Sequence, residues 1–453
     1  MSIPAIAIVG RPNVGKSSLF NRLLKRRQAI VGDRPGVTVD RVEHVWDVHG
    51  QSTILVDTGG IGETPHGTMQ DAIDQQVQAA LDVAHIVFFV VDGQCGLTTV
   101  DQSIARKLRH TGLPIILVVN KAEAEGSEME FHRLGITQLI PTSAVHGKGI
   151  KELLHATSHL LPKEAEVNEE DDEDIIAKIA IIGRPNVGKS SLVNRWIGRD
   201  RMVVSPIAGT TRDAIDTDIA HREGKVRLID TAGQRKQGRI NDVIEFVSRV
   251  KGRQALHRAQ AAVLLLDGEE TIVEQDMRLI QMAQDEGSAL VIAVNKSDAM
   301  TEQESERYEQ RLSYRMRSQH DLKVCHISAQ TGQGCKALLK AAIAAAKRNQ
   351  FTLSTGELNR WLEYAEQQQY VPHRKAGVIR LKYATQVTTN PPTIKIFSNR
   401  PTKIKETYVR YLEQSFKKNF DLAAVPVRFI FDGSTNPYMP DPTKKHIPDH
   451  KKK

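Results

Sequence analysis

The sequence predicts an α/β protein in which one domain is present twice, followed by a small α+β domain. The ten residues GRPNVGKSSL occur at 10–19 and again at 183–192. In both halves, short apolar runs alternate with helical segments, a pattern typical of a mostly parallel sheet with helices on both faces. Positive charge is concentrated after residue 350, which sets the last part of the chain apart.

The repeat extends well beyond these ten residues. Insertions separate the shared positions, which indicates a duplicated domain because surface loops change length while core elements keep their register. The offset grows by two residues and then to twelve in all across four further matches: Thr38 with Thr211, Asp57 with Asp230, Asn120 with Asn295, and Ser143 with Ser328.

Length and composition limit the class of protein. A chain of 453 residues is too long for one core and suggests about three domains. Contents of 40% hydrophobic and 26% charged residues are ordinary for a soluble globular protein. No apolar run reaches the roughly 20 residues of a membrane span. Three cysteines far apart, Cys95, Cys325 and Cys335, argue against disulfides and metal binding. We therefore expect a cytoplasmic protein without a membrane span, and a monomer.

Five segments follow from these patterns. Residues 163–174, KEAEVNEEDDED, are acidic and almost devoid of hydrophobic side chains, so they read as a self-repelling linker. The tail after residue 435 is rich in Pro, His and Lys, which is typical of disorder. The predicted segments are a first domain at 1–162, a linker at 163–175, a second domain at 176–350, a third domain at 351–435 and a basic tail at 436–453.

Buried parallel strands are expected wherever apolar runs are bounded by turn signals. In the first copy these are 3–9, 53–56, 86–91, 115–119 and 138–141, and in the second 177–182, 225–229, 261–266, 289–294 and 323–327. In an open α/β sheet, ligands bind at the carboxyl ends of the strands.

The third domain has a different predicted order, α-β-β-α-β. The expected elements are a helix at 353–369, strands at 378–387 and 393–398, a helix at 403–419 and a strand at 425–431. Residues 351–453 contain 18 Lys/Arg and 9 Asp/Glu, a net charge of +9, whereas residues 1–350 carry −1. This charge indicates a phosphate-rich partner. The candidate backbone contacts are Arg400, Lys403, Lys405, Arg410, Lys417 and Lys418; the alternative is surface charge without such a role.

Each copy contains GxxxxGKS between a strand and a helix, the context of a phosphate-binding loop. The glycines let successive N–H groups point into one concavity at a helix N-terminus. Lys16 and Lys189 are expected to reach the β and γ phosphates, and the hydroxyls of Ser17 and Ser190 to bind Mg²⁺. The predicted loops are Gly10, Arg11, Pro12, Asn13, Val14, Gly15, Lys16 and Ser17, and Gly183, Arg184, Pro185, Asn186, Val187, Gly188, Lys189 and Ser190.

The sequences DTGG and DTAG follow the second strand of each copy and supply a carboxylate beside the metal. Thr38 and Thr211 are candidates to complete the Mg²⁺ site when a third phosphate is present. The second set of predicted ligand-contacting residues is Asp57, Thr58, Gly59, Gly60 and Ile61, and Asp230, Thr231, Ala232, Gly233 and Gln234.

Guanine selectivity is predicted by the stretch Asn295-Lys296-Ser297-Asp298. The carboxylate of Asp298 can accept hydrogen bonds from both N1–H and the exocyclic amine of guanine, an arrangement that adenine does not offer. The first copy has Asn120-Lys121-Ala122-Glu123, in which a longer side chain must be accommodated, and we expect weaker affinity there. Ser143-Ala144 and Ser328-Ala329 are expected to place a backbone N–H on the guanine carbonyl oxygen.

The residue after DxxG also differs between the copies. Gln234 can orient an attacking water, whereas Ile61 cannot. Two interpretations of Gln234 stay open: it speeds hydrolysis in the second domain, or it is an exposed loop residue that does not face the phosphate. The candidate catalytic residues are Lys16, Thr38, Lys189, Thr211 and Gln234.

These motifs together resemble the bacterial tandem GTPases of the Der (EngA) family. The resemblance covers essentially the whole chain and implies two P-loop G domains, a KH-like third domain, and GTP hydrolysis coupled to assembly of the large ribosomal subunit and its rRNA. It also implies that Asn13 and Asn186 are candidate K⁺ ligands, which would place charge between the phosphates. Glu123 and Gln234 depart from the usual pattern of the family. Typical KH domains use a GxxG loop, which Gly356, Gly377 and Gly433 are too far apart to form.

Two alternatives remain. An RNA-modifying enzyme gated by the G domains would need a nucleophile or cofactor motif after residue 350, where there is no cysteine and no cofactor loop. An RNA-binding scaffold with a single hydrolytic G domain is compatible with Glu123. In either case the expected ligands are GTP, GDP and Mg²⁺, with K⁺ as a further candidate.

Overall fold

The structure is a computed structural model that describes residues 3–28, 43–60, 77–78, 80–123, 126, 128–162, 174–199, 206–207, 216–230, 242–316, 322–371 and 378–433. The chain divides into two compact units, Met1–Lys347 and Arg348–Lys453. The first unit contains the two copies of the repeated domain. The predicted linker and basic tail lie almost entirely outside the described residues.

The first copy is built on a sheet with strand order β2-β3-β1-β4-β5-β6 in the described residues. β2 is antiparallel to β3, and the remaining neighbours are parallel. The strands are β1 (Ala5–Val9), β2 (Glu43–Val48), β3 (Gln51–Asp57), β4 (Ile86–Asp92), β5 (Ile115–Asn120) and β6 (Gln138–Pro141). The helical segments are α1 (Lys16–Gln28), η1 (Thr58–Gly60), α3 (Thr99–Arg109), η2 (Met129–Leu134) and α4 (Ile150–Leu160).

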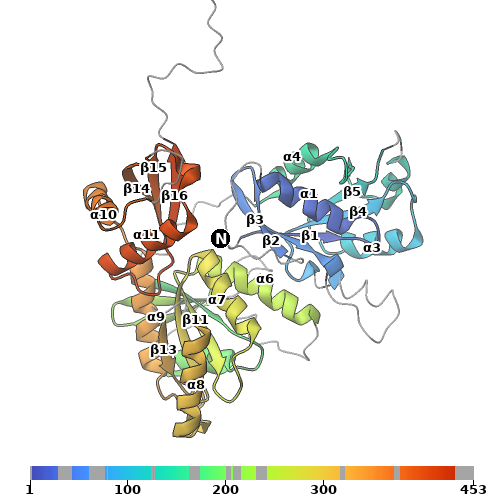
Figure 1. Ribbon diagram of the computed structural model, residues 1–453. Helices are drawn as coiled ribbons and strands as arrows, with labels where there is room; N and C mark the ends of the chain where they lie inside the picture. Colours follow the sequence, from blue (N-terminus) through green and yellow to red (C-terminus); the bar gives the residue numbers. More distant parts are fainter. Residues whose placement is uncertain are drawn as a thin grey trace, which may run out of the picture. The chain divides into compact units, whose positions relative to one another are not determined.

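Alternation along β1 explains why both faces of this sheet are covered. Ile6 and Ile8 pack with side chains of α1 and α4 in one core cluster, whereas Ala5, Ala7 and Val9 pack with side chains of α3 in another. Because successive side chains of a strand point to opposite faces, an uninterrupted apolar run is buried on both sides. Figure 1 shows the helices of this domain around its sheet.

The second copy has the strand order β13-β12-β11-β7-β10-β9-β8 in its described part. β8 and β9 are antiparallel additions beside β10, and the rest of the sheet is parallel. The strands are β7 (Ile175–Ile182), β8 (Pro206–Ile207), β9 (Asp216–His221), β10 (Gly224–Ile229), β11 (Ala261–Asp267), β12 (Ala289–Asn295) and β13 (Lys323–His326). The helical segments are α5 (Lys189–Arg199), α6 (Asp242–Arg258), α7 (Glu274–Glu286), η4 (Ser297–Ala299), α8 (Glu302–Arg315) and α9 (Cys335–Asn349).

Strands β2, β8 and β9 were not predicted from the sequence. β2 reads EHVWDV and β9 reads DTDIAH, so polar and charged side chains interrupt the apolar pattern. Their backbone nevertheless pairs with a neighbouring strand, and side chains such as Trp46 and Asp216 are buried. Strand pairing at a sheet edge therefore overrides a weak local signal.

The Arg348–Lys453 unit has the predicted α-β-β-α-β order, and this prediction is confirmed. Its strand order is β14-β15-β16 in the described residues, with β14 antiparallel and β16 parallel to β15. Aromatic side chains hold both helices against one face of the sheet: Trp361 meets Phe416 at 4.8 Å, and Phe416 meets Phe429 at 5.8 Å between ring centroids. The elements are α10 (Thr355–Gln368), β14 (Leu381–Thr389), β15 (Pro392–Ser398), η5 (Pro401–Lys403), α11 (Glu406–Asn419) and β16 (Arg428–Gly433).

Candidate nucleotide-binding sites

The two GxxxxGKS loops connect β1 to α1 and β7 to α5, at the carboxyl ends of the strands. Gly15 has φ +93° and Gly188 has φ +97°. A Cβ at either position would lie 2.3 Å from the side-chain nitrogen of Asn120 or Asn295. Both the left-handed backbone and the close approach therefore require glycine. The second glycine of the motif is thus needed by the fold as well as by the expected phosphate contact.

The side-chain ammonium of each loop's lysine is hydrogen-bonded to the backbone at the start of the same loop. Lys16 Nζ donates to the carbonyl oxygens of Gly10 and Arg11 at 2.8 and 3.0 Å. Lys189 Nζ donates to those of Gly183 and Arg184 at 2.9 and 2.6 Å. Burial lowers the pKa of Lys189 to about 8. Burial also lowers the pKa of Lys16, although the negative charge of Asp57 opposes the effect. A phosphate anion at either ammonium would stabilise its charged form.

A hydroxyl and a carboxylate predicted to hold Mg²⁺ are brought together in the first domain. Ser17 Oγ donates to Asp57 Oδ2 at 2.7 Å, and the N–H of Gly59 donates to Asp57 Oδ1 at 2.9 Å. Asp57 is buried at the end of β3. These are hard oxygen donors of the kind that Mg²⁺ prefers, so the residues fit the ion. Thr58, the next residue, donates from its hydroxyl to Ile8 O at 2.8 Å and so ties this segment to β1.

The corresponding residue of the second domain, Asp230, has a backbone contact to a second aspartate. Asp230 has φ +54°, and its N–H donates to Asp216 Oδ1 at 3.1 Å. Ser190 is the second residue of α5 and directly follows Lys189. Several predicted residues lie outside the described residues: Thr38, Ile61, Thr211, Thr231, Ala232, Gly233 and Gln234. Their roles stay predictions.

One asparagine in each domain joins the phosphate loop to the loop expected to contact the base. Asn120 Nδ2 donates to Val14 O at 2.9 Å, and Asn120 Oδ1 accepts from the N–H of Ala144 at 3.0 Å. Asn295 repeats both contacts, with Val187 O at 2.8 Å and the N–H of Ala329 at 2.9 Å. The two N–H groups that sequence reasoning assigned to guanine are therefore engaged by these side chains. A guanine oxygen would have to share them.

Sequence reasoning missed two buried aspartates at the ends of β4 and β11. Asp92 Oδ2 lies 2.6 Å from Lys121 Nζ, and Asp267 Oδ2 lies 2.6 Å from Lys296 Nζ. Burial acts to raise the pKa of Asp92, but the hydrogen bond from Lys121 and two backbone N–H groups lower it overall. Both lysines have positive φ, which these contacts help to stabilise. A signal was present: Asp-Gly follows a strand in both copies at the offset shared by Asn120 and Asn295.

Glu123 of the first domain is held by two neighbours. Its Oε1 accepts from Ser143 Oγ at 2.9 Å, and its Oε2 accepts from Gln94 Nε2 at 3.0 Å. Each carboxylate oxygen can accept more than one hydrogen bond, so both oxygens keep capacity for a base. At the position of Gln94, the second domain has Glu269, which pairs with Lys296 at 2.9 Å. Gln94 is thus a contact of this site that sequence reasoning missed.

The arginine of each phosphate loop forms an ion pair with an aspartate in the first turn of a helix, α3 or α7. Arg184 Nε lies 2.9 Å from Asp276 Oδ1, and its NH1 lies 2.8 Å from Glu270 Oε2. In the first domain, Arg11 Nε lies 3.5 Å from Asp101 Oδ2. The counterpart of Glu270 is Cys95, which offers no carboxylate. Arg184 of the second phosphate loop therefore has two carboxylates at shorter distances, where, among the described residues, Arg11 of the first has the single contact at 3.5 Å.

The tyrosines of the third domain differ in exposure. The sequence favours positions in the core or at a domain interface, over base-stacking platforms, for Tyr370, Tyr383, Tyr408 and Tyr411. Tyr408 is fully buried, but Tyr370 is 81% exposed and Tyr383 is 46% exposed. Tyr383 stands on the sheet face opposite to α10 and α11, where its ring stacks on Phe397 at 4.3 Å. Tyr370 and Tyr383 therefore lie outside the core of this domain, because a tyrosine on a three-stranded sheet is buried only on the face that helices cover; a position at a domain interface stays a prediction for both.

The candidate basic residues lie in and before α11. Arg410 and Lys417 form ion pairs with Glu406 and Glu413 one helical turn away. Arg400, Lys403, Lys405 and Lys418 are exposed. Within the described residues, no helix is both long and apolar enough to cross a membrane.

Comparisons with known proteins agree with this geometry. A family model described as a 50S ribosome-binding GTPase matches residues 5–121 and 178–296. A second, described as the KH-domain-like C-terminal part of EngA bacterial GTPase enzymes, matches residues 352–431.

Curated relatives match over almost the whole chain. GTPase Der of Stenotrophomonas maltophilia (strain R551-3) is 40% identical over 440 residues, covering 96% of this chain and 94% of the relative. GTPase Der of Halothermothrix orenii is 40% identical over 441 residues, with coverage of 96% and 100%. GTPase Der of Synechococcus sp. (strain JA-3-3Ab) is 41% identical over 437 residues, with 95% of each covered. The chain is therefore a GTPase with two P-loop G domains and a KH-like domain, and it belongs to the Der (EngA) family.

Proposed function

We propose that this GTPase is a nucleotide-controlled switch in the assembly of the large ribosomal subunit. Binding of GTP orders the loops around Thr38 and Asp57 and those around Thr211 and Asp230, and hydrolysis releases them. The observation that supports this proposal most is that both domains of the chain contain the same set of asparagine contacts. Asn120 and Asn295 each connect a phosphate loop to the loop expected to contact the base, with nearly equal hydrogen-bond distances.

We propose the following roles in the two sites. Lys16 and Lys189 neutralise the β and γ phosphates, and Gln234 orients water in the second domain. Mg²⁺, held by Ser17, Thr38 and Asp57 or by Ser190, Thr211 and Asp230, supplies positive charge to the phosphate oxygens when bound. Asn13 and Asn186 are the candidate ligands of K⁺. Glu123 and Asp298 select guanine.

The partner proposed for the third domain is ribosomal RNA. Its support is the net charge of +9 after residue 350 and the exposure of Arg400, Lys403, Lys405 and Lys418. Phosphate contacts of this kind depend on salt, because each releases counterions. The division into domains at 1–162, 176–350 and 351–435, a monomeric state and action in the cytoplasm belong to the same proposal.

Co-sedimentation with ribosomal subunits tests the switch directly. The chain is incubated with a non-hydrolysable GTP analogue, with GDP or without nucleotide, and its fraction bound to large subunits is measured. Only the first condition is expected to give strong association. Equal association in all three conditions contradicts the switch.

A second candidate function is an RNA-binding scaffold in which only one G domain hydrolyses GTP. The observation that favours it is Glu123 in place of Asp at the first base site. Single-turnover hydrolysis in the Lys16→Ala and Lys189→Ala variants separates the two. If Lys16→Ala leaves both hydrolysis and ribosome association unchanged, the scaffold is the better description.

A further inference from the structure

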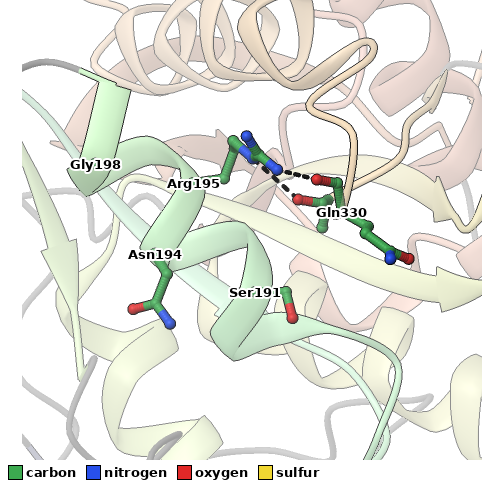
Figure 2. A pocket seen from close by; sticks show the side chains of 6 residues that line it. Ser191, Asn194, Arg195, Gly198 and Gln330 are labelled. Atoms are coloured by element: carbon green, nitrogen blue, oxygen red, sulfur yellow. Dashed lines mark hydrogen bonds between the residues drawn. The ribbon is translucent and has the colours of Figure 1, made fainter.

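An arginine on the helix after each phosphate loop grips the base loop, defined here as residues 143–145 in the first domain and 328–330 in the second. Arg22 Nε donates to Ala144 O at 2.7 Å, and its NH2 donates to Val145 O. Arg195 Nε donates to Ala329 O at 3.1 Å, and its NH2 donates to Gln330 O. Figure 2 shows Arg195 reaching from α5 to the loop of Gln330. The same contact is thus formed twice in one chain.

The position of these arginines explains the shared geometry. Each lies six residues after the lysine of its phosphate loop, within the first two turns of α1 or α5. The planar guanidinium presents several N–H donors in a fixed fork, which matches two successive carbonyl oxygens. A lysine ammonium at this position would act as a point charge without that geometry. The helix is therefore joined to the base loop by a directional contact.

The contact also orients the loop's peptide groups. In a planar trans peptide, the N–H points opposite to the C=O. Turning Ala144 O and Ala329 O toward the arginines therefore turns the N–H groups of Val145 and Gln330 to the opposite side of the loop. On its other side, each loop is held by Asn120 or Asn295 through the N–H of the alanine.

The arginine contact borders an open hollow in the second domain. The hollow has a volume of about 370 Å³ and is lined by Ser191, Asn194, Arg195, Gly198, Ala329 and Gln330. Ala329 and Gln330, whose carbonyl oxygens accept from Arg195, are thus among the residues that line this hollow. Without the guanidinium, water would satisfy these carbonyl oxygens without fixing their direction.

We propose that Arg22 and Arg195 are positioning residues for guanine recognition in the two G domains. Each keeps the base loop at a fixed distance and orientation from the helix that begins at the phosphate loop. The nucleotide is thereby held at both of its ends by one rigid framework. This inference rests on the proposed binding of GTP at these two sites.

Titration of the full chain tests the inference with two probes, GDP and inorganic pyrophosphate. Pyrophosphate engages only the phosphate loop, whereas GDP also engages the base loop. The second site is measured in a chain whose first site is disabled by Lys16→Ala. We expect Arg195→Ala to weaken GDP binding about tenfold, because two hydrogen bonds of a charged donor are lost. Pyrophosphate binding should stay within about twofold of the parent.

Two further variants complete the design. Arg195→Lys keeps the charge and most of the side chain, so it tests the fork geometry even if Arg195→Ala does not fold; we expect an intermediate loss of GDP binding. Arg278→Ala removes a surface arginine of the same domain, one that pairs with Glu274 on α7, and should change neither affinity. Arg22→Ala in a Lys189→Ala chain should repeat the result at the first site.

The outcomes separate the inference from the proposed function. Unchanged GDP affinity in Arg195→Ala, or an equal loss of GDP and pyrophosphate affinity in Arg195→Ala and Arg195→Lys, overturns the positioning role. Failure of the Lys16→Ala parent to bind GDP at all overturns the proposed nucleotide site instead.

Discussion

Gln94 is predicted to be required for full guanine-nucleotide affinity at the first site. Its amide donates to Glu123 Oε2 at 3.0 Å, while Ser143 Oγ donates to Oε1 at 2.9 Å. Glutamate has one methylene more than the aspartate expected here, so its carboxylate has an additional torsion to fix. The change Gln94→Ala removes one of the two restraints and leaves the carboxylate itself in place.

The expected magnitude follows from the exposure of this contact. A hydrogen bond to a charged group contributes about 1.5–3 kcal/mol when it is well shielded. Gln94 and Glu123 are both exposed, so we expect about 0.5–1 kcal/mol, which corresponds to a loss of affinity of roughly two- to fivefold. Ser143 is buried, and Ser143→Ala should therefore have the larger effect.

The assay is titration of a fluorescent GDP into the full chain carrying Lys189→Ala. Glu123→Asp provides the matched background, because the shorter carboxylate no longer extends to Gln94. Addition of Gln94→Ala to Glu123→Asp should then cause no further loss of GDP affinity, so the effects of the two substitutions are not additive. The reasoning is refuted if Gln94→Ala binds like the parent, or if it weakens binding equally in both backgrounds.

Three further predictions concern the phosphate loops. Gly15→Ala should abolish nucleotide binding at the first site, because its Cβ would lie 2.3 Å from the Asn120 amide and displace the loop; normal binding in the titration would contradict this. Asp276→Ala leaves the Arg184 guanidinium, only 15% exposed, with Glu270 as its remaining carboxylate partner, and should cost the second domain about 2 kcal/mol in urea unfolding; a loss below about 1 kcal/mol would contradict a stabilising role of the Arg184–Asp276 pair. For Lys189, with a folded pKa of about 8 against the ordinary lysine value of 10.5, the unfolded chain binds more protons between these pH values, so stability without nucleotide should rise with pH in this window, by up to about 3 kcal/mol. Thermal unfolding across this range should show a steeper rise in the parent than in Lys189→Met, in which only other groups such as Lys16 still contribute; equal slopes would contradict the reasoning.

Short-range patterns were sufficient to predict most of the fold. The parallel strands β4, β5, β11 and β12 are continuous apolar runs, and buried parallel strands must be apolar on both faces. The phosphate loops were equally clear, because their glycines, lysine and serine occupy one short stretch. The edge strand β2 and the strand β9, which lies next to the edge, were missed because a strand exposed on one side, or buried around a hydrogen-bonded aspartate, lacks that continuous signal.

Within the sites, the sequence by itself predicted which residue types are to contact the phosphates, and it predicted guanine through the Asn-Lys-x-Asp order and its variant ending in Glu123. Only the tertiary structure decided which side chains support them. Gln94 contacts Glu123, Lys121 contacts Asp92, and Arg22 contacts residues more than a hundred positions away. Such contacts depend on where parallel strands end in space, and no local periodicity encodes that arrangement. Short motifs therefore indicate which residues take part in the chemistry, while the sheet topology determines which distant side chains contact and position those residues.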